Sequence, residues 1–372
     1  MNCLLTGATG IVGSHIMFEW LHKALTTKDV NHLYVVIRTS KISAIERLKE
    51  ILEDTDKPSF LNQYSTETLL GKLTVIESDL LSLDLKSSKS LNFDTIIHCA
   101  GSTNLLQTLD TQNTVKEQNL EVTKHLLNEF KSKLKRFLYI STAYSFGIQP
   151  EKVDDTIENH TITDFRNPYE ASKYESERFV KEFCLENSIN SQILRPSIVC
   201  GRLINTPLFE TPKFDVFYSW PMFLSKYAKK CTENFRIWID KASGLNIVPV
   251  DFVAKAVIYA FLKPELKELN IVNPEQILHK DYVGNVLRSF KITNFEYTAT
   301  KPENLNAFEE LYYKTIGLVF EKYLSVPDLQ FNAEAISALI KQLGLESNLG
   351  VHKNFMNLIN FSVEKEFRKS YS

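Results

Sequence analysis

Residues 2–16 read NCLLTGATGIVGSHI, and this stretch decides the fold. The apolar run at 2–5 predicts a buried strand, and apolar residues at helical spacing over 11–25 predict a helix. Between them Gly7 permits a tight turn, Gly10 lets the backbone approach a phosphate group, and Gly13 lets the helix pack closely on the strand. The helix N-terminus adds unpaired N–H groups and a positive dipole end. We therefore predict a dinucleotide pyrophosphate site formed by Gly7, Thr9, Gly10, Ile11, Val12 and Gly13.

Strand and helix patterns alternate through the first two hundred residues. Most of the strands are near-continuous apolar runs, as expected for strands that are buried on both faces. Such alternation predicts an α/β fold of the Rossmann type, a doubly wound parallel sheet covered by helices on both sides. The predicted strands are Asn2–Leu5, Leu33–Ile37, Leu73–Ile76, Thr95–His98, Phe137–Ile140 and Ser191–Leu194.

The pattern changes after residue 202. Residues 203–231 are rich in aromatic residues and proline, and the chain from Lys280 onward is mostly helical, with one apolar stripe over 305–323. A strand at 244–249, a helix at 250–262 and a strand at 269–272 are expected to return to the first sheet. We therefore predict a dinucleotide-binding domain at 1–202, to which 244–273 returns. A smaller, mostly helical substrate-binding region is then built from 203–243 and 274–372.

Composition narrows the class of protein. The formal net charge of −2 provides no basic surface for nucleic acid. The five cysteines are scattered, none lies at zinc-site spacing, and the pattern is typical of a reducing compartment, so no metal is expected. No apolar run reaches the ~18 residues of a membrane helix. The N-terminus enters a strand at once, without a targeting segment. A cytoplasmic protein is expected.

Arg38 favours NADP(H) over NAD as the cofactor. It closes the second strand, LYVVIRTS, where an enzyme that prefers NAD usually carries an acidic residue for the ribose 2′-hydroxyl. A guanidinium suits a 2′-phosphate through charge-assisted hydrogen bonds, and Arg47 is a second candidate contact. Asp79 and Leu80 follow the third strand and are expected beside the adenine. Small residues after the fourth strand would let the cofactor lie close to the backbone: Cys99, Ala100 and Gly101.

Tyr169 and Lys173 form the candidate acid–base pair. Their i,i+4 spacing places both on one helix face, where the lysine ammonium is expected to lower the pKa of the phenol from about 10 toward working pH. The fifth strand ends with Ser141 and Thr142, at the edge of the sheet where ligands of such folds bind. A hydroxyl there can bind a substrate oxygen as negative charge develops. Asn119 lies on the preceding helix and is expected to organise the proton relay.

These motifs together resemble the extended short-chain dehydrogenases/reductases, over about residues 2–275. The segments that carry the resemblance are TGATGIVG, SDL, YISTAYSFG, NPYEASK, LRPSIVCG and IVPVDFVAKA. Within that group the chain is most similar to the thioester reductase and fatty acyl-CoA reductase branch, of the male-sterility type. This branch typically has an arginine closing strand two and a long insertion before strand three.

The resemblance implies NADPH-dependent reduction of an acyl thioester or of the derived aldehyde. By this likeness Thr142, which we choose over Ser141 for its spacing from Gly147, polarises the carbonyl. Tyr169 protonates the oxygen, and Lys173 tunes Tyr169 and holds the nicotinamide ribose. Pro196 and Ile198 pass beside the nicotinamide. The substrate would arrive on CoA or on an acyl carrier protein in trans, and a homodimer is among the assemblies expected for this group.

Three functional hypotheses remain open at this point. The aromatic run over 209–227 either walls an apolar acyl pocket or fills a domain core. An NADP-dependent dehydrogenase or epimerase of a sugar nucleotide, steroid or small ketone would use the same catalytic residues. A catalytically silent dinucleotide-binding regulator is the third hypothesis, although such proteins tend to lose the tyrosine or the lysine.

Overall fold

The computed structural model describes residues 1–38, 40–83, 91–149 and 151–368. A seven-stranded sheet runs through the molecule in the order β11-β6-β5-β4-β1-β2-β3, and every neighbouring pair is parallel. The predicted Rossmann-type α/β fold is confirmed. The strands of the sheet are β1 (Cys3–Thr6), β2 (Leu33–Ile37), β3 (Leu73–Glu77), β4 (Thr95–His98), β5 (Arg136–Ile140), β6 (Asn190–Pro196) and β11 (Glu268–Ile271).

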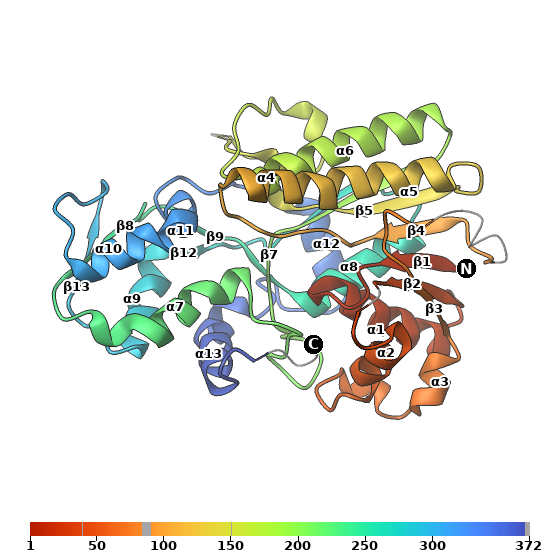
Figure 1. Ribbon diagram of the computed structural model, residues 1–372, viewed down its shortest axis with the longest axis horizontal. Helices are drawn as coiled ribbons and strands as arrows, with labels where there is room; N and C mark the ends of the chain where they lie inside the picture. Colours follow the sequence, from red (N-terminus) through yellow and green to blue (C-terminus); the bar gives the residue numbers. More distant parts are fainter. Residues whose placement is uncertain (39, 84–90, 150, 369–372) are drawn as a thin grey trace.

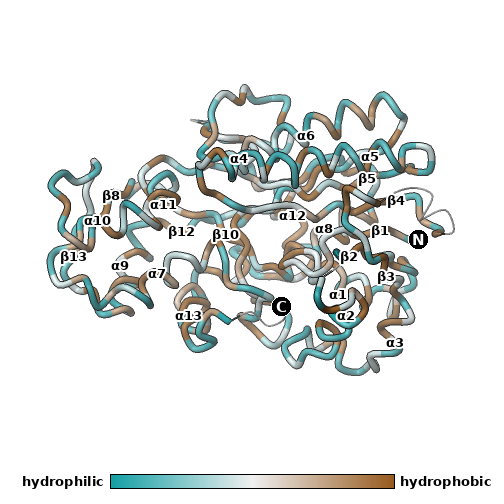
Figure 2. Tube along the Cα trace, in the orientation of Figure 1, coloured by the Kyte–Doolittle hydropathy of each residue, from teal (hydrophilic) through white to brown (hydrophobic). Residues whose placement is uncertain are grey.

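Helices cover both faces of the sheet because successive strand residues point to opposite sides (Figure 1). In β1, Cys3 and Leu5 belong to one buried cluster and Leu4 to a second. The first cluster includes α1, where Trp20 packs edge-on against Phe261 of α8, with ring centroids 4.9 Å apart. The second lies beneath α5 and α6. Figure 2 shows the hydrophobic positions gathered along the central strands and the helix faces beside them.

The helices vary in length, and several short 3₁₀ or π segments lie between them. The α-helices are α1 (Ile11–Thr26), α2 (Ala44–Glu53), α3 (Thr66–Leu70), α4 (Leu109–Lys116), α5 (Val122–Phe130), α6 (Pro168–Glu186), α7 (Ser219–Tyr227), α8 (Val250–Leu262), α9 (His279–Ser289), α10 (Ala307–Lys314), α11 (Gly317–Leu324), α12 (Glu334–Gln342) and α13 (Val351–Glu364). The remaining turns are 3₁₀ segments at Ser59–Leu61, Ala143–Phe146, Ile157–Asn159, Val216–Tyr218 and Ala228–Lys230, and a π turn at Glu117–Glu121. In the part of the chain that is described, no helix combines the length and apolar character needed to cross a membrane.

The strand predicted at 244–249 does not join the main sheet. It divides into β9 (Gly244–Leu245), which pairs with β12 (Ile277–Leu278), and β10 (Ile247–Pro249), which pairs with β7 (Ile198–Cys200). The reason is that β11 already occupies the free edge of β6 over residues 193–196, so β10 can pair only with the chain beyond that strand. The prediction was wrong for this strand. The predicted helix and the second predicted strand do return to the first domain, because α8 lies against α1 and β11 pairs with β6.

The predicted single apolar stripe over 305–323 is also corrected, because it is divided between two helices. The chain turns at Thr315, where φ is −124° and ψ is −103°, and α11 begins two residues later. Phe308 and Tyr312 of α10 pack against Phe235 of β8 (Phe235–Trp238), which pairs with an unpredicted strand, β13 (Phe295–Thr298). The stripe is therefore split between a core face on α10 and a second face on α11.

The glycine-rich turn has the geometry expected of it. Gly7 has a φ of +75°, and a Cβ there would lie 2.8 Å from the backbone nitrogen of Ala100. The Gly10 N–H donates to the Gly7 carbonyl at 2.9 Å, and a Cβ on Gly13 would lie 2.0 Å from that same carbonyl oxygen. Strand, turn and helix therefore approach each other more closely than any side chain allows.

Replacing Gly13 with alanine should destabilise the protein. The new methyl group cannot fit without moving the backbone of the turn, so we expect a loss of about 1–3 kcal/mol in the free energy of unfolding. Urea denaturation measures it. Gly71→Ala is the matched control, because its Cβ would lie 3.3 Å from the nearest atom and its φ of −61° suits alanine. Equal losses in the two variants would contradict the steric explanation.

Candidate active site

A cavity of about 270 Å³ opens where the carboxyl ends of β1, β4, β5 and β6 meet. This is the edge of the sheet at which ligands of such folds bind. The structure brings together here most of the residues selected from the sequence. Those that line the cavity are Gly7, Gly10, Ile11, Val12, Gly13, Cys99, Gly101, Thr142, Tyr169, Lys173, Pro196 and Ile198.

Lys173 and Tyr169 both reach the cavity from the first two turns of α6. Asn167 caps this helix by accepting a hydrogen bond from the Glu170 N–H at 3.1 Å, and Pro168 occupies the first helical position. The Lys173 ammonium donates to the carbonyl of Ile140 at 2.7 Å and to the Tyr139 hydroxyl at 3.1 Å. The lysine is thus tied to the end of β5.

The predicted net lowering of the Tyr169 pKa is not what the structure shows. Burial raises the pKa of the phenol, and this effect exceeds the lowering caused by Lys173 and by the hydrogen bond with Thr142. Burial likewise lowers the pKa of Lys173, while Tyr169 opposes that shift. The lysine therefore acts in the predicted direction, but desolvation favours the neutral phenol.

Ser141 and Thr142 both line the cavity, but their hydroxyls have different surroundings. The Thr142 side chain lines it beside Tyr169, and the Ser145 hydroxyl holds the Thr142 carbonyl at 2.9 Å. The Ser141 hydroxyl points the other way and donates to the carboxylate of Glu177 on α6. The Ser141 hydroxyl is thus bound to α6, which leaves Thr142 as the candidate hydroxyl at the cavity.

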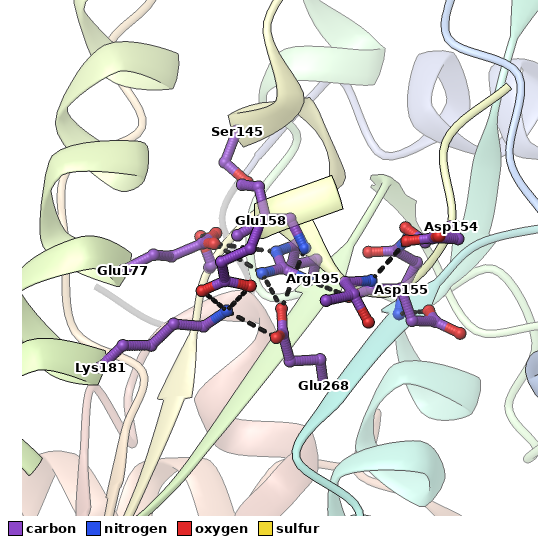
Figure 3. A network of polar contacts seen from close by, with 12 residues as sticks. Ser145, Asp154, Asp155, Glu158, Glu177, Lys181, Arg195 and Glu268 are labelled. Atoms are coloured by element: carbon purple, nitrogen blue, oxygen red, sulfur yellow. Dashed lines mark hydrogen bonds and ion pairs between the residues drawn. The ribbon is translucent and has the colours of Figure 1, made fainter. Parts of the chain in front are cut away.

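Behind the cavity lies a buried charge network centred on Arg195 (Figure 3). Its guanidinium donates to the Glu177 carboxylate from Nε and Nη2, at 2.9 and 2.8 Å, and to the Asp155 carbonyl from Nη1 at 2.9 Å. Glu268 of β11 binds both Arg195 and Lys181. The pair of Arg195 and Glu177 is fully buried. The network therefore connects β6 and β11 to α6, the helix that carries Tyr169 and Lys173.

Asn119 lies outside the cavity lining but is fixed beside it. It occupies the π turn at 117–121, where its Oδ1 accepts from the Ser102 N–H at 2.7 Å and its Nδ2 donates to the Ser172 hydroxyl at 2.9 Å. A Cβ on Gly101 would lie 2.7 Å from that Oδ1 and 3.8 Å from the Lys173 nitrogen. Asn119 therefore positions the loop after β4 and the helix that carries Lys173. The extra residue of a π turn leaves no periodic signal in the sequence, which predicted only a helix here.

The predicted adenine-side residues lie along the same edge of the sheet, outside the cavity. Arg38 is exposed, and Arg47 donates to the Arg38 carbonyl at 3.1 Å. Asp79 is exposed and accepts from the Leu81 N–H at 2.9 Å, while Leu80 packs against the second core cluster. Thr9 and Ala100 also lie outside the lining.

The residues present fit a dinucleotide. Gly7 and Gly101 line the cavity with bare backbone, and a Cβ at either position would collide with neighbouring atoms of the chain. The buried Ser197 hydroxyl, between Pro196 and Ile198 in the cavity wall, has no hydrogen-bond partner within the described residues. A nicotinamide group beside it would supply polar partners.

The sequence identified only part of the apolar wall of the cavity. Of the aromatic run over 209–227, Phe217 and Trp220 line the cavity, whereas Phe214, Tyr218 and Phe223 belong to the buried core without lining it. The rest of the wall comes from distant segments, including Leu245, Tyr282, Val286, Val319, Phe320, Tyr323, Leu324, Phe355 and Ile359. The i,i+4 spacing of the pairs 282 and 286, 319 and 323, 320 and 324, and 355 and 359 could have indicated a shared face within each helix, but not that the helices meet at one cavity.

A Rossmann-type fold with a threonine, a tyrosine and a lysine at one cavity is the arrangement of NAD(P)-binding proteins of the extended short-chain dehydrogenase/reductase class. A family model described as male sterility protein matches residues 5–257. The chain belongs to this family.

Curated relatives and solved structures agree with this assignment. The chain is 23% identical to the L-2-aminoadipate reductase large subunit of Candida glabrata over 80% of its own length and 21% of the relative's. It is 28% identical to fatty acyl-CoA reductase 1 of Gallus gallus over 53% of its length and 43% of the relative's. The chain thus spans less than half of either relative.

Two solved structures share the fold. The terminal R domain from the myxalamid PKS-NRPS biosynthetic pathway superimposes with a TM-score of 0.67 at 18% identity, covering 100% of this chain and 92% of that one. UDP-glucuronic acid 4-epimerase from Bacillus cereus gives a TM-score of 0.57 at 20% identity, with 80% and 86% covered.

Arg195→Met should strongly destabilise the protein. It leaves the Glu177 carboxylate buried without its cation, so we expect a loss of about 3–5 kcal/mol in the free energy of unfolding. Chemical denaturation checks this value. The control is Arg178→Met on the same helix, whose ion pair with Glu182 is exposed and should contribute at most about 1 kcal/mol. A similarly small loss for Arg195→Met would contradict the role given to the buried pair.

Proposed function

We propose that this chain is an NADPH-dependent reductase of an acyl thioester, carried on CoA or on an acyl carrier protein, or of the aldehyde derived from it. The observation that carries the proposal is that the cavity lined by Thr142, Tyr169 and Lys173 has an otherwise largely apolar wall, built from side chains of α7, α9, α11 and α13. When a thioester binds, such a wall would accommodate its apolar acyl chain while the thioester carbonyl group lies at Thr142, Tyr169 and Lys173.

The chemistry of the wall favours an acyl substrate over a sugar nucleotide. Among the lining residues, the charged side chains away from Lys173 are Lys213 and Asp215, and they form an ion pair with each other. No arginine occurs among the cavity-lining residues that the structure describes. The diphosphate of a sugar nucleotide would need cationic side chains or N–H donors in this wall, and its sugar hydroxyls would need polar side chains as hydrogen-bond partners.

Some of the relatives support the same substrate class, whereas others, such as a UDP-glucose 4-epimerase of Yersinia enterocolitica, belong to the sugar-nucleotide alternative. One matched protein is a fatty acyl-CoA reductase, and two structural neighbours are reductase domains of synthetases, one of them a thiolation-reductase di-domain from an archaeal non-ribosomal peptide synthetase. A substrate delivered by a carrier protein in trans is consistent with these neighbours.

Arg38 supports NADPH as the cofactor. Its side chain is exposed at the carboxyl end of β2, next to the strand that leads into the glycine turn. The Arg47 hydrogen bond fixes the backbone at this point and leaves the Arg38 guanidinium available for a 2′-phosphate.

The chain's own residues supply binding and proton transfer. The backbone at Gly7, Gly10 and Gly101 would hold the cofactor, with Lys173 at its ribose and Ser197 at its nicotinamide. NADPH, when bound, supplies the hydride. As the carbonyl carbon accepts it, Tyr169 Oη donates its proton to the carbonyl oxygen while the Thr142 hydroxyl donates a hydrogen bond to the same oxygen. The raised Tyr169 pKa keeps this proton available at neutral pH.

From a thioester the first product is a hemithioacetal. Loss of its hydroxyl proton and cleavage of its C–S bond release the thiol and leave the aldehyde. Reduction of the aldehyde to the alcohol would need a second NADPH and a second proton through the same residues.

The first test is NADPH oxidation at 340 nm with a panel of acyl-CoAs and matching aldehydes. We expect turnover that increases with apolar chain length, and a loss of about 10²–10⁴-fold in kcat/KM for Tyr169→Phe, which lacks the proton donor. NADPH oxidation by Tyr169→Phe at the wild-type rate would contradict the assignment of Tyr169 as the proton donor. Absence of turnover with either substrate class, despite NADPH binding, would refute the acyl reductase and favour a silent dinucleotide-binding protein.

A second test concerns the cofactor. Arg38→Ala should reduce the preference for NADPH over NADH by about 10-fold to 100-fold, because the guanidinium makes a charge-assisted contact to the 2′-phosphate. Binding titrations with both cofactors measure the preference. Lys41→Ala is the control, since this exposed lysine lies three residues away. An unchanged ratio in Arg38→Ala would exclude Arg38 as the selectivity residue.

A further inference from the structure

A polar cluster at the start of α6 has no part in the mechanism above. Its members are buried: the carboxylate of Glu170 accepts from the Arg166 N–H at 3.0 Å, and the Arg166 guanidinium lies between the carboxylates of Glu170 and Asp328. Nη1 of Arg166 also donates to the Gly147 carbonyl at 2.9 Å. The cluster therefore surrounds the first turn of the helix that carries Tyr169.

Tyr323 of α11 joins this cluster to the cavity. Its ring lines the cavity and makes an edge-to-face contact with the ring of Tyr144, with the two ring centroids 5.7 Å apart. Its hydroxyl donates to Glu170 Oε1 at 2.8 Å and accepts from Asn167 Nδ2 at 2.6 Å. Burial and the Glu170 carboxylate raise the pKa of Tyr323 well above its ordinary value, so the hydroxyl keeps its proton.

The two partners of this hydroxyl flank the catalytic tyrosine. Asn167 is the helix cap and Glu170 the third helical residue, so Pro168 and Tyr169 lie between them. The first turn of a helix has N–H groups without intrahelical partners and depends on outside contacts for its position. Here the outside contact is supplied by a residue that lies far along the chain, in α11.

α11 is itself held firmly. The Tyr323 carbonyl accepts from His279 Nε2 of α9 at 3.1 Å, and the Leu324 carbonyl accepts from the Asp240 N–H at 2.7 Å. Because α11 is bound to these other segments, its Tyr323 side chain can hold the first turn of α6 in place.

We propose that Tyr323 is a positioning residue of the active site, which holds the first turn of α6 so that Tyr169 meets the substrate carbonyl. The C-terminal segment thereby completes the catalytic half of the cavity as well as its wall. The inference rests on the proposed function only where it concerns turnover, and its structural part can be tested separately.

The variant Tyr323→Phe keeps the ring in the wall and removes the hydroxyl. We expect kcat to fall about tenfold to a hundredfold through misplacement of Tyr169, with KM for the acyl substrate and the affinity for NADPH changed less than about twofold. Tyr323→Leu, which also removes the ring, should show the same loss in kcat with an additional rise in KM.

Tyr313→Phe is the matched control. This buried tyrosine of α10 also makes two hydrogen bonds, donating to the Arg236 carbonyl at 3.0 Å and accepting from the Trp238 N–H at 3.0 Å, but it does not line the cavity. A general loss of stability would therefore affect both variants, whereas a positioning role would affect only Tyr323→Phe. Equal effects on kcat in the two variants would overturn the proposal.

Amide hydrogen exchange of a peptide covering residues 166–173 gives a readout without turnover. We expect faster exchange in Tyr323→Phe than in wild type, and no change in Tyr313→Phe. Unchanged exchange at this peptide in Tyr323→Phe refutes the proposal. If wild type reduces no acyl thioester or aldehyde, the proposed function fails, and the exchange result alone still decides whether Tyr323 holds the turn.

Discussion

The buried ion pair of Arg195 and Glu177 is the interaction on which the active site depends. Arg195 comes from β6 and Glu177 from α6, and the Glu177 carboxylate also binds Ser141 at the end of β5. Two charges taken out of water are stable only if their hydrogen-bonding capacity is filled, and the Asp155 carbonyl and Glu268 complete it here. Pro196 follows Arg195 directly, Lys173 lies one helical turn before Glu177, and Thr142 follows Ser141, which binds Glu177. The three residues are therefore held in one frame.

The two halves of the cavity are built on different physical principles. The half proposed for the cofactor is formed by backbone: glycines allow the chain to approach closely, and the helix N-terminus supplies N–H groups. The half proposed for the substrate is made of side chains from α7, α9, α11 and α13, which are brought together by packing of the apolar core. A backbone surface suits a cofactor shared by many enzymes, whereas a side-chain wall can vary with the substrate.

The protonation of the catalytic pair shows where local reasoning from the sequence stops. The i,i+4 spacing placed Lys173 beside Tyr169 and predicted the direction of its effect correctly. The net pKa shift of Tyr169 has the opposite sign because burial dominates it. Burial depends on the tertiary structure, which places Tyr169 in one cavity with residues as distant in the sequence as Phe320 and Tyr323.

The sequence by itself determined the parallel sheet, the glycine turn and the placing of Thr142, Tyr169 and Lys173 at one edge of the sheet. These features follow from local periodicity and from the rule that parallel strands end on the same side. Only the tertiary structure decided that β10 leaves the main sheet, that a π turn aims Asn119 and that Tyr323 reaches the start of α6. Each of these depends on which distant segment occupies a free edge or fills a gap, and such long-range competition leaves no periodic signal in the chain.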